Sequence, residues 1–281
     1  MKTATLASVV FLSTLSQTPA YAQDISVGVG IGSRDISALE GTVEEYLDKR
    51  GYGEQLPGLD DAIDFDGTTI PYILLTGMYT PRKPILPMGT TEHLVELDWT
   101  SSLFGVEKDE QTLDLKYEGL DLGEGDVSWS YKINTYLSLG AGTHYTPLII
   151  HHGKSNIRLG FILQGGISYV NGVANLGLSL ANNKLYEAMD PVMVEESYGI
   201  AEHSTVNAKF SGLGYFFHPT AAFSVDLGKR LTLEMDWGYR PEYIPVDVTE
   251  TVTSADTTVE KTRGNLNLSG KTTNLKVEYH F

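Results

Sequence analysis

The chain contains no cysteine, which excludes disulfide bonds, thiolate metal sites and a cysteine nucleophile. Basic residues are also scarce: 20 Lys and Arg stand against 36 Asp and Glu, giving a formal net charge of −16 at pH 7. Because affinity for phosphate backbones depends on basic patches, we expect no nucleic-acid partner. Gly28, Gly30 and Gly32 alternate along a strand-like segment and no helix opens at the last of them, so they form no nucleotide-binding fingerprint. We therefore expect no cofactor.

Long apolar runs are missing as well. The N-terminus combines Lys2, a mostly apolar segment over 4–15 and Ala20-Tyr21-Ala22, a pattern that predicts a secretory signal peptide over residues 1–22. No later stretch approaches eighteen consecutive apolar residues, the minimum for a transmembrane helix. Since only helices and closed barrels satisfy every backbone hydrogen bond in hydrocarbon, any part that spans a membrane must be a β-barrel.

The last nine residues, 273–281, form the most regular stretch of the chain. Leu275, Val277, Tyr279 and Phe281 alternate with polar residues, so that a strand would have one apolar and one polar face. The stretch resembles the closing strand of the outer-membrane β-barrel proteins of Gram-negative bacteria, which ends in Phe as an assembly signal. The resemblance implies residence in the cell outer membrane, with lipid, lipopolysaccharide and the barrel-assembly machinery as partners. It implies no particular activity, and any extracellular partner stays open.

Alternating apolar and polar residues recur throughout residues 23–281. They predict an all-β fold, a transmembrane antiparallel up-and-down β-barrel of about ten strands, with eight to twelve as the range. The expected strands are residues 25–32, 69–79, 93–104, 112–122, 127–139, 156–170, 173–181, 211–227, 231–240 and 273–281. Tight turns are expected at Gly123, Asn171-Gly172 and Gly228, all at the periplasmic end. Three long loops, 33–67, 182–208 and 241–265, are expected outside the cell.

The first of these loops contains a helical pattern. Residues 37–40 form a capping box, and Leu39, Val43 and Tyr46 then fall on one face, which predicts a short helix over about 38–50. The apolar stripe needs a partner. The barrel mouth or lumen can provide it, and so can the loop itself. The inward glycines of the first strand leave room inside the barrel for another group.

Charged residues fall at the positions that the alternation directs into the lumen. The expected lumen charge network consists of Glu96, Asp98, Asp114, Lys116, Glu118, Lys132, Arg158, Asp226, Glu234, Asp236, Arg240, Lys276 and Glu278. Residues expected to face lipid include Trp129, Leu137, Phe161, Phe223 and Leu233. A lumen of this width can be filled by side chains, so we favour a closed interior held by ion pairs. The protein would then be a structural or surface-interaction protein, and a narrow porin-like channel that prefers cations is the alternative.

One acidic cluster invites comparison with a calcium-binding loop. Asp60, Asp61, Asp64 and Asp66 supply several carboxylates from one short segment, as hard cations require. The spacing fails, because taking Asp64 and Asp66 as the third and fifth ligands makes the first position Ala62 and the twelfth Ile73. These aspartates are weak candidates, and we predict no metal site.

Two His/Ser pairings suggest a minor alternative function, an outer-membrane hydrolase that acts on lipid or protein. His203 and Ser204 are adjacent, so a strand would direct their side chains to opposite faces. His152 and Ser155 are separated by a turn-like Gly153-Lys154. Neither pairing reproduces the pattern of lipid A deacylases or omptin proteases, so we assign no catalytic residue.

The closing strand gives the first testable prediction. Deleting Phe281, or replacing it with a charged residue, should reduce the amount of folded barrel in the outer membrane, because it removes the aromatic end of the assembly signal. Heat-modifiable mobility of the membrane fraction measures folded barrel. Unchanged levels of heat-modifiable protein would contradict the assigned role of Phe281.

Overall fold

The computed structural model describes residues 22–49, 69–81, 89–117, 120–152, 155–179, 203–253 and 257–281. Its elements are β1 (Ala22–Asp35), α2 (Leu39–Lys49), β2 (Thr69–Pro81), β3 (Thr90–Tyr117), β4 (Leu120–His152), β5 (Ser155–Ser179), β6 (His203–Asp226), β7 (Leu231–Arg240), β8 (Glu242–Thr253), β9 (Thr257–Asn267) and β10 (Gly270–His280). Almost all of the expected signal peptide and the four aspartates of the candidate calcium loop lie outside the described residues.

Eight of the ten strands close into a ring. Antiparallel pairing runs from β1 through β2, β3, β4, β5, β6, β7 and β10, and β10 pairs back with β1. Along β6, residues 220–226 pair with β7 and residues 205–216 pair with β8, while β9 pairs with β8. β8 and β9 therefore prolong β7 and β10 beyond the ring. The predicted fold class, an antiparallel β-barrel of eight to twelve strands with a short helix, is confirmed.

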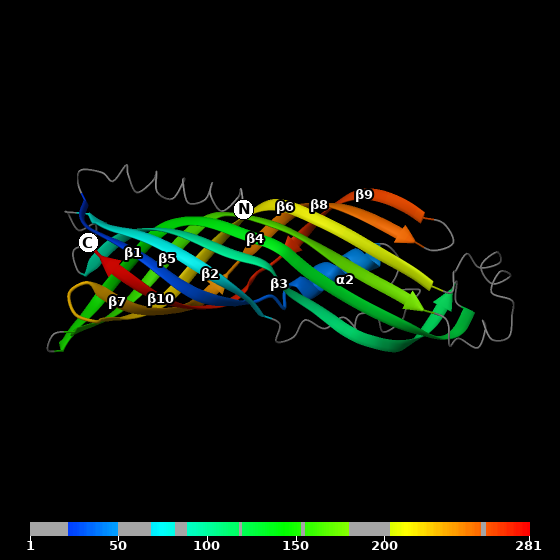
Figure 1. Ribbon diagram of the computed structural model, residues 1–281, viewed down its shortest axis with the longest axis horizontal. Coiled ribbons are helices and arrows are strands. Elements are labelled where there is room, and N and C mark those ends of the chain that lie inside the picture. The colour runs from blue at the N-terminus through cyan, green and yellow to red at the C-terminus, as the bar shows by residue number, and fades with distance from the viewer. Residues whose placement is uncertain are drawn as a thin grey trace.

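One end of the molecule extends beyond the ring. β1 and β2 reach only Asp35 and Thr69 at this end, whereas β3, β4, β5 and β6 run on beside β8 and β9. Figure 1 shows these strands continuing away from the C-terminus, with α2 lying among them. We call this part of β3–β6, together with β8 and β9, the distal extension.

Within the ring, the outer face is apolar and the inner face is polar. Outward side chains remain open to the surroundings, among them Phe161 at 61% and Leu163 at 55% exposure, while the inward Glu234 and Lys276 are each 1% exposed. An apolar outer band around a polar interior is the pattern of a transmembrane barrel, whose outer face contacts lipid. A barrel of this kind resides in the cell outer membrane. Among the described residues, no helix has the length and apolar character to cross a membrane.

In the distal extension this pattern is reversed. Trp129 and Tyr131 of β4 are buried at 6% and 7% exposure, whereas Lys132 is exposed on the outer face. The predictions that Trp129 faces lipid and that Lys132 faces the lumen are therefore wrong. The β4–β5 register shifts between Ile133 and Thr135, an irregularity that returns the apolar side chains of the following residues, such as Leu139, to the outer face. Outside the membrane the outer face contacts water, so apolar side chains turn inward.

Two of the expected turns do not occur in the described part of the chain, and the same reversal explains the one expected at Asn171-Gly172. Asn171 and Gly172 lie inside β5, and the inward face changes there from the polar Gln164 and Ser168 to Ala174 and its apolar successors. In the sequence, such a switch of the apolar side within one continuous strand resembles a hairpin. Gly123 likewise lies within β4, in register with Leu115 of β3. The turn at Gly228 is confirmed, and its φ of 89° is one that glycine adopts without strain.

Part of each expected long loop is regular structure. The loop expected at 241–265 is wrong, because β8 and β9 occupy most of it. Pro241 and Pro245 suggest a loop, yet Ile244 and Val246 point inward on either side of Pro245, which points outward. β6 begins at His203, inside the loop expected at 182–208. In 33–67, β1 continues to Asp35 and α2 follows, while residues 50–68 lie outside the described part of the chain.

The predicted helix is confirmed as α2, and its partner is the inner face of the distal extension. The backbone N–H of Ser37 donates to Asp35 Oδ1 at 2.9 Å just before the helix. Leu39 is 5% exposed, and Val43 and Tyr46 pack against the same apolar cluster as the strands. Thr42 Oγ1 accepts the backbone N–H of Asn267 at 3.1 Å, which links α2 to β9. The helix thus covers apolar side chains that the barrel wall presents inward.

The reversed polarity predicts unequal effects of arginine on one strand face. Leu163→Arg should lower the free energy of unfolding by about 2–4 kcal/mol, because its outward side chain contacts lipid. Asn175→Arg, on the same face of β5 but in the distal extension, should change it by less than about 1 kcal/mol, because its side chain contacts water. Urea unfolding in lipid bilayers measures both values, and equal costs would show that the apolar band does not end between the two positions.

Candidate functional site: the buried charges of the lumen

The lumen of the ring contains two layers of buried charged side chains. The first, which we call the distal layer, consists of Arg34, Asp98, Tyr136, Arg240 and Glu242, and lies where the ring passes into the distal extension. The second, the central layer, consists of Glu96, Glu234, Asp236 and Lys276 with Gln164 and His144. Every one of these side chains is at most 4% exposed.

In the distal layer, Arg240 joins opposite walls of the barrel. Its Nη1 lies 2.5 Å from Asp98 Oδ2, and because β7 and β3 are four strands apart in a ring of eight, this ion pair spans the full lumen. Arg240 Nε lies 3.2 Å from Glu242 Oε2, and Arg34 forms an ion pair with the same carboxylate. The guanidinium also stacks on the ring of Phe216, 3.5 Å from its centroid.

Tyr136 of β4 completes this layer. Its hydroxyl accepts hydrogen bonds from Arg240 Nη2 at 2.7 Å and Arg34 Nη1 at 3.1 Å, and donates to Glu242 Oε1 at 3.0 Å. One hydroxyl thus connects side chains from β1, β4, β7 and β8. Buried charges require such partners, because an ion without them would lose its hydration uncompensated.

In the central layer, Lys276 of β10 is surrounded by carboxylates. Its Nζ lies 2.7 Å from Asp236 Oδ2, 2.9 Å from Glu234 Oε1 and 3.5 Å from Glu96 Oε2. The contact with Glu96 crosses the lumen to β3, and Gln164 Nε2 of β5 donates to the other oxygen of Glu96 at 3.0 Å. The layer therefore connects β3, β5, β7 and β10.

The glycines of β1 make room for part of this packing. A Cβ at Gly32 would lie 2.4 Å from the ring of Tyr72 and 2.2 Å from Asn274 Oδ1, so only glycine fits at this position. The Tyr72 hydroxyl donates to Asn274 Oδ1 at 2.6 Å, and Asn274 Nδ2 donates to Asp236 Oδ1 at 2.8 Å. Side chains from β2 and β10 thus occupy the space that the glycine row leaves.

A third group lies at the end of the barrel near the C-terminus. Asp226 Oδ2 accepts Arg158 Nη2 at 2.9 Å and Asn156 Nδ2 at 2.6 Å, and Asp226 Oδ1 accepts the Thr232 hydroxyl at 2.9 Å. Thr232 Oγ1 lies 2.8 Å from His280 Nε2 of β10. This group ties β5, β6, β7 and β10 together below the central layer.

The structure brings most of the predicted lumen residues together. Those that point into the ring are Glu96, Asp98, Arg158, Asp226, Glu234, Asp236, Arg240, Lys276 and Glu278. Lys132 is exposed on the outer face, and Asp114 and Lys116 lie on the part of β3 in the distal extension, outside the ring. Glu118 lies outside the described residues.

Sequence reasoning missed Arg34, Glu242 and Tyr136. Arg34 continues the inward positions of Gly28, Gly30 and Gly32, but it fell within an expected loop. Glu242 also fell within an expected loop, the one over 241–265 that Pro241 suggests. Tyr136 lies at an inward position of β4, and residue alternation gives no sign that its hydroxyl is the shared hydrogen-bonding partner of two arginines.

The His/Ser pairings lie at the two ends of the molecule. His203 is in register with Ser179 and Ser204 with Leu178, so the two neighbours occupy opposite faces of β6 in the distal extension. His152 is opposite Ser155 at the β4–β5 hairpin, and the adjacent His151 lies 2.7 Å from Asn156 Oδ1. Neither pairing belongs to the lumen layers.

Comparison with known proteins finds distant structural likeness only. No family model and no curated protein matches the chain. Among solved structures, the outer membrane protein OprG from Pseudomonas aeruginosa is 15% identical with a TM-score of 0.35, and 93% of this chain and 97% of that chain are covered. A major outer membrane protein from Thermus thermophilus is 11% identical with a TM-score of 0.35, over 92% and 99% of the two chains. The outer membrane protease OmpT from Escherichia coli is 8% identical with a TM-score of 0.25, over 95% and 100%. The assignment of the fold rests on the ring and its apolar outer face.

The distal layer predicts a large difference between two arginines. Arg240→Met should lower the free energy of unfolding by about 3–5 kcal/mol, because Asp98 and Glu242 remain buried with one partner fewer. Arg263→Met breaks the exposed pair with Asp247, whose side chains are 91% and 80% exposed, and should cost at most about 1 kcal/mol. Urea unfolding in lipid compares the two. A cost for Arg240→Met as small as that for Arg263→Met would show that the layer does not stabilise the barrel.

Proposed function

We propose that this protein is a closed outer-membrane barrel, with a structural and surface-interaction role, and that it conducts no ions at rest. The observation that supports this most directly is the Arg240–Asp98 ion pair at 2.5 Å, which joins opposite walls of the ring. An open pore needs a continuous water path along its axis, and a side-chain bridge between opposite strands occupies that path.

The two charged layers support the same conclusion together. Arg240 and Lys276 are each 1% exposed, so water has little access to the bridging side chains from either end. An eight-stranded ring has an interior that side chains can fill, and here the tyrosines and long charged residues fill it. The layers belong to successive levels of the lumen, so a solute would have to displace both.

The alternative, a cation-preferring channel, derives from the excess of acid in the central layer. Lys276 faces Glu96, Glu234 and Asp236, and Glu278 is also buried, at 2% exposure. Carboxylates facing a water-filled lumen would favour small cations. The present contacts favour closure, because each of the three carboxylates that face Lys276 lies within 3.5 Å of its Nζ.

The distal extension supports a role at the cell surface. It carries an exposed polar outer face that includes Lys132, Asp247 and Arg263, so this part of the molecule is suited to water. The apolar band of the ring would contact lipid and lipopolysaccharide, and it would hold the extension at a fixed height above the membrane. In this account the barrel is the anchor and the distal extension is the part that meets extracellular partners.

Electrical recording tests the proposal. The purified protein in planar bilayers should show little or no steady conductance, because the two layers block the lumen. Glu234→Gln and Asp236→Asn should leave that baseline unchanged. A stable, cation-selective conductance of the unaltered protein that falls in these two variants would overturn the proposal and make the protein a channel.

A further inference from the structure

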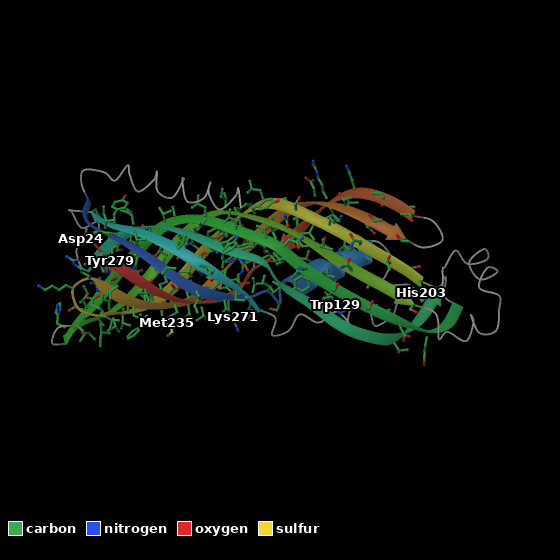
Figure 2. The ribbon with its side chains drawn as sticks, in the orientation of Figure 1. Asp24, Trp129, His203, Met235, Lys271 and Tyr279 are labelled. Atoms are coloured by element: carbon green, nitrogen blue, oxygen red, sulfur yellow. The ribbon has the colours of Figure 1, made fainter. Side chains whose placement is uncertain are left out.

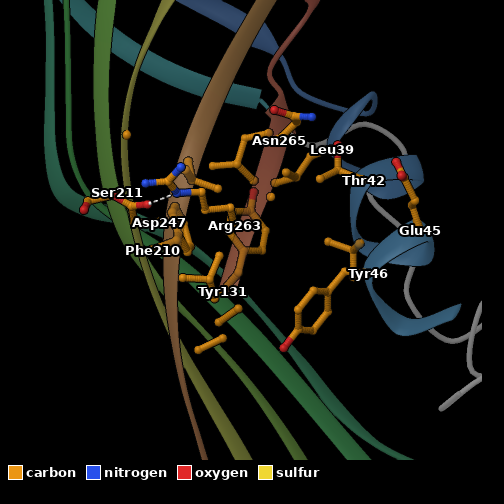
Figure 3. A pocket seen from close by; sticks show the side chains of 18 of the residues that line it. Leu39, Thr42, Glu45, Tyr46, Tyr131, Phe210, Ser211, Asp247, Arg263 and Asn265 are labelled. Carbon is orange, nitrogen blue, oxygen red and sulfur yellow. Dashed lines mark hydrogen bonds and ion pairs between the residues drawn. The ribbon is translucent and has the colours of Figure 1, made fainter. Parts of the chain in front are cut away.

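A cavity of about 600 Å³ lies where α2 faces the distal extension. Figure 3 shows Leu39 and Tyr46 extending from α2 toward the strands that carry Tyr131 and Phe210. The inward apolar residues that line the cavity include Leu39, Val43, Tyr46, Trp129, Phe210 and Val246. Cavities that bind small organic molecules have volumes of about 300–1,000 Å³, and this one falls within that range.

The lining has the chemistry of a site for an apolar body. Aromatic side chains come from α2, β4 and β6, and the rings of Trp129 and Tyr131 are stacked at 6.3 Å with an interplanar angle of 9°. Apolar cavities do not hold water well, because a buried water needs two to four polar partners. An apolar molecule fills such a space more favourably than water does.

The charged residues of the lining lie at its exposed positions, which leaves the apolar part of the cavity without a partner for an ionic ligand. Four of the described lining residues are charged, and they form two pairs: Glu45 with Lys49 at 2.6 Å, and Asp247 with Arg263 at 3.2 Å. All four side chains are exposed to solvent, at 72% and 68% for Lys49 and Glu45 and at 91% and 80% for Arg263 and Asp247, so none of these charges lies in the apolar part of the cavity. A ligand with a net charge would have to enter the apolar part of the cavity and lose its hydration without compensation.

From this geometry we propose that the cavity between α2 and the distal extension is a binding site for a small, uncharged, predominantly apolar organic molecule. The inference extends the proposed surface-interaction role of the distal extension by naming its ligand class. It requires no passage through the lumen, because the cavity lies beyond the distal layer that closes the ring.

Fluorescence energy transfer from Trp129 tests the site. The chain has three tryptophans, and Trp99 and Trp237 point outward at 44% and 46% exposure, so a variant with Trp99→Phe and Trp237→Phe retains a single donor inside the cavity. The probe is N-phenyl-1-naphthylamine, which is uncharged and accepts energy from tryptophan. It is titrated into this variant in lipid nanodiscs, and nanodiscs without protein correct for partitioning into lipid. We expect saturable transfer with one probe per chain.

Two comparisons define the site and its chemistry. Ala208→Phe places a ring in the cavity and should weaken the dissociation constant by at least about tenfold, whereas Lys209→Phe places the same ring on the outer face and should leave it unchanged. The anionic analogue 8-anilinonaphthalene-1-sulfonate should bind at least about tenfold more weakly than the uncharged probe. Heat-modifiable mobility shows that each variant is folded, and Ala174→Phe replaces Ala208→Phe if the latter does not fold.

Several results would overturn the inference. Transfer that does not saturate, or that equals lipid partitioning, would exclude a site. Equal affinity in the variants with a ring inside and outside would place the probe elsewhere, and equal or tighter binding of the sulfonate would contradict the uncharged class. A conducting barrel that still binds the probe would contradict only the proposed closure, so the two proposals fail separately.

Discussion

The polarity of the barrel wall depends on which medium it faces, and this constraint organises the whole structure. In the ring, lipid covers the outside, so Phe161 and Leu163 point out while Glu234 and Lys276 point in. In the distal extension, water covers the outside, so Trp129 points in and Lys132 points out. Figure 2 shows Met235 and Tyr279 on the ring, and Trp129 of β4 and His203 of β6 toward the other end of the molecule. β3, β4, β5 and β6 cross the boundary without a break, and what changes along them is which face carries the apolar side chains.

The side chains of the inner face therefore need different partners on the two sides of this boundary. Polar groups buried in the narrow ring need partners, and the distal and central layers supply them with cross-lumen ion pairs centred on Arg240 and Lys276. The proposed closure of the lumen would follow from the pairing of these buried charges. The apolar inner face of the distal extension needs a cover instead, and α2 provides it through Leu39 and Tyr46. Because the cover is incomplete, a cavity remains.

Residue alternation is sufficient to predict the barrel and nine of the lumen residues, because a strand assigns successive side chains to opposite faces whatever lies around it. The helix is predicted by its capping box and its helical apolar face. It could not locate the membrane boundary. At Asn171 the apolar residues change parity, and without knowledge of the medium such a change is indistinguishable from a turn. At Ile133 their parity stays the same, and the register shift between Ile133 and Thr135 moves them to the other face, which alternation alone does not show. The cross-lumen partners of Tyr136 could not be inferred either, because alternation gives facing and no distances between strands.

Because the chain has no cysteine, single cysteines can report directly where the medium changes. The most direct measurement introduces them at successive outward positions of β5, from Leu159 to Gly177, in membrane-embedded protein and measures reaction with a water-soluble maleimide. The account predicts no reaction from 159 through 167 and rapid reaction at 173, 175 and 177. Uniform reactivity along the strand, or protection that persists through 177, would contradict a boundary between lipid and water at this level.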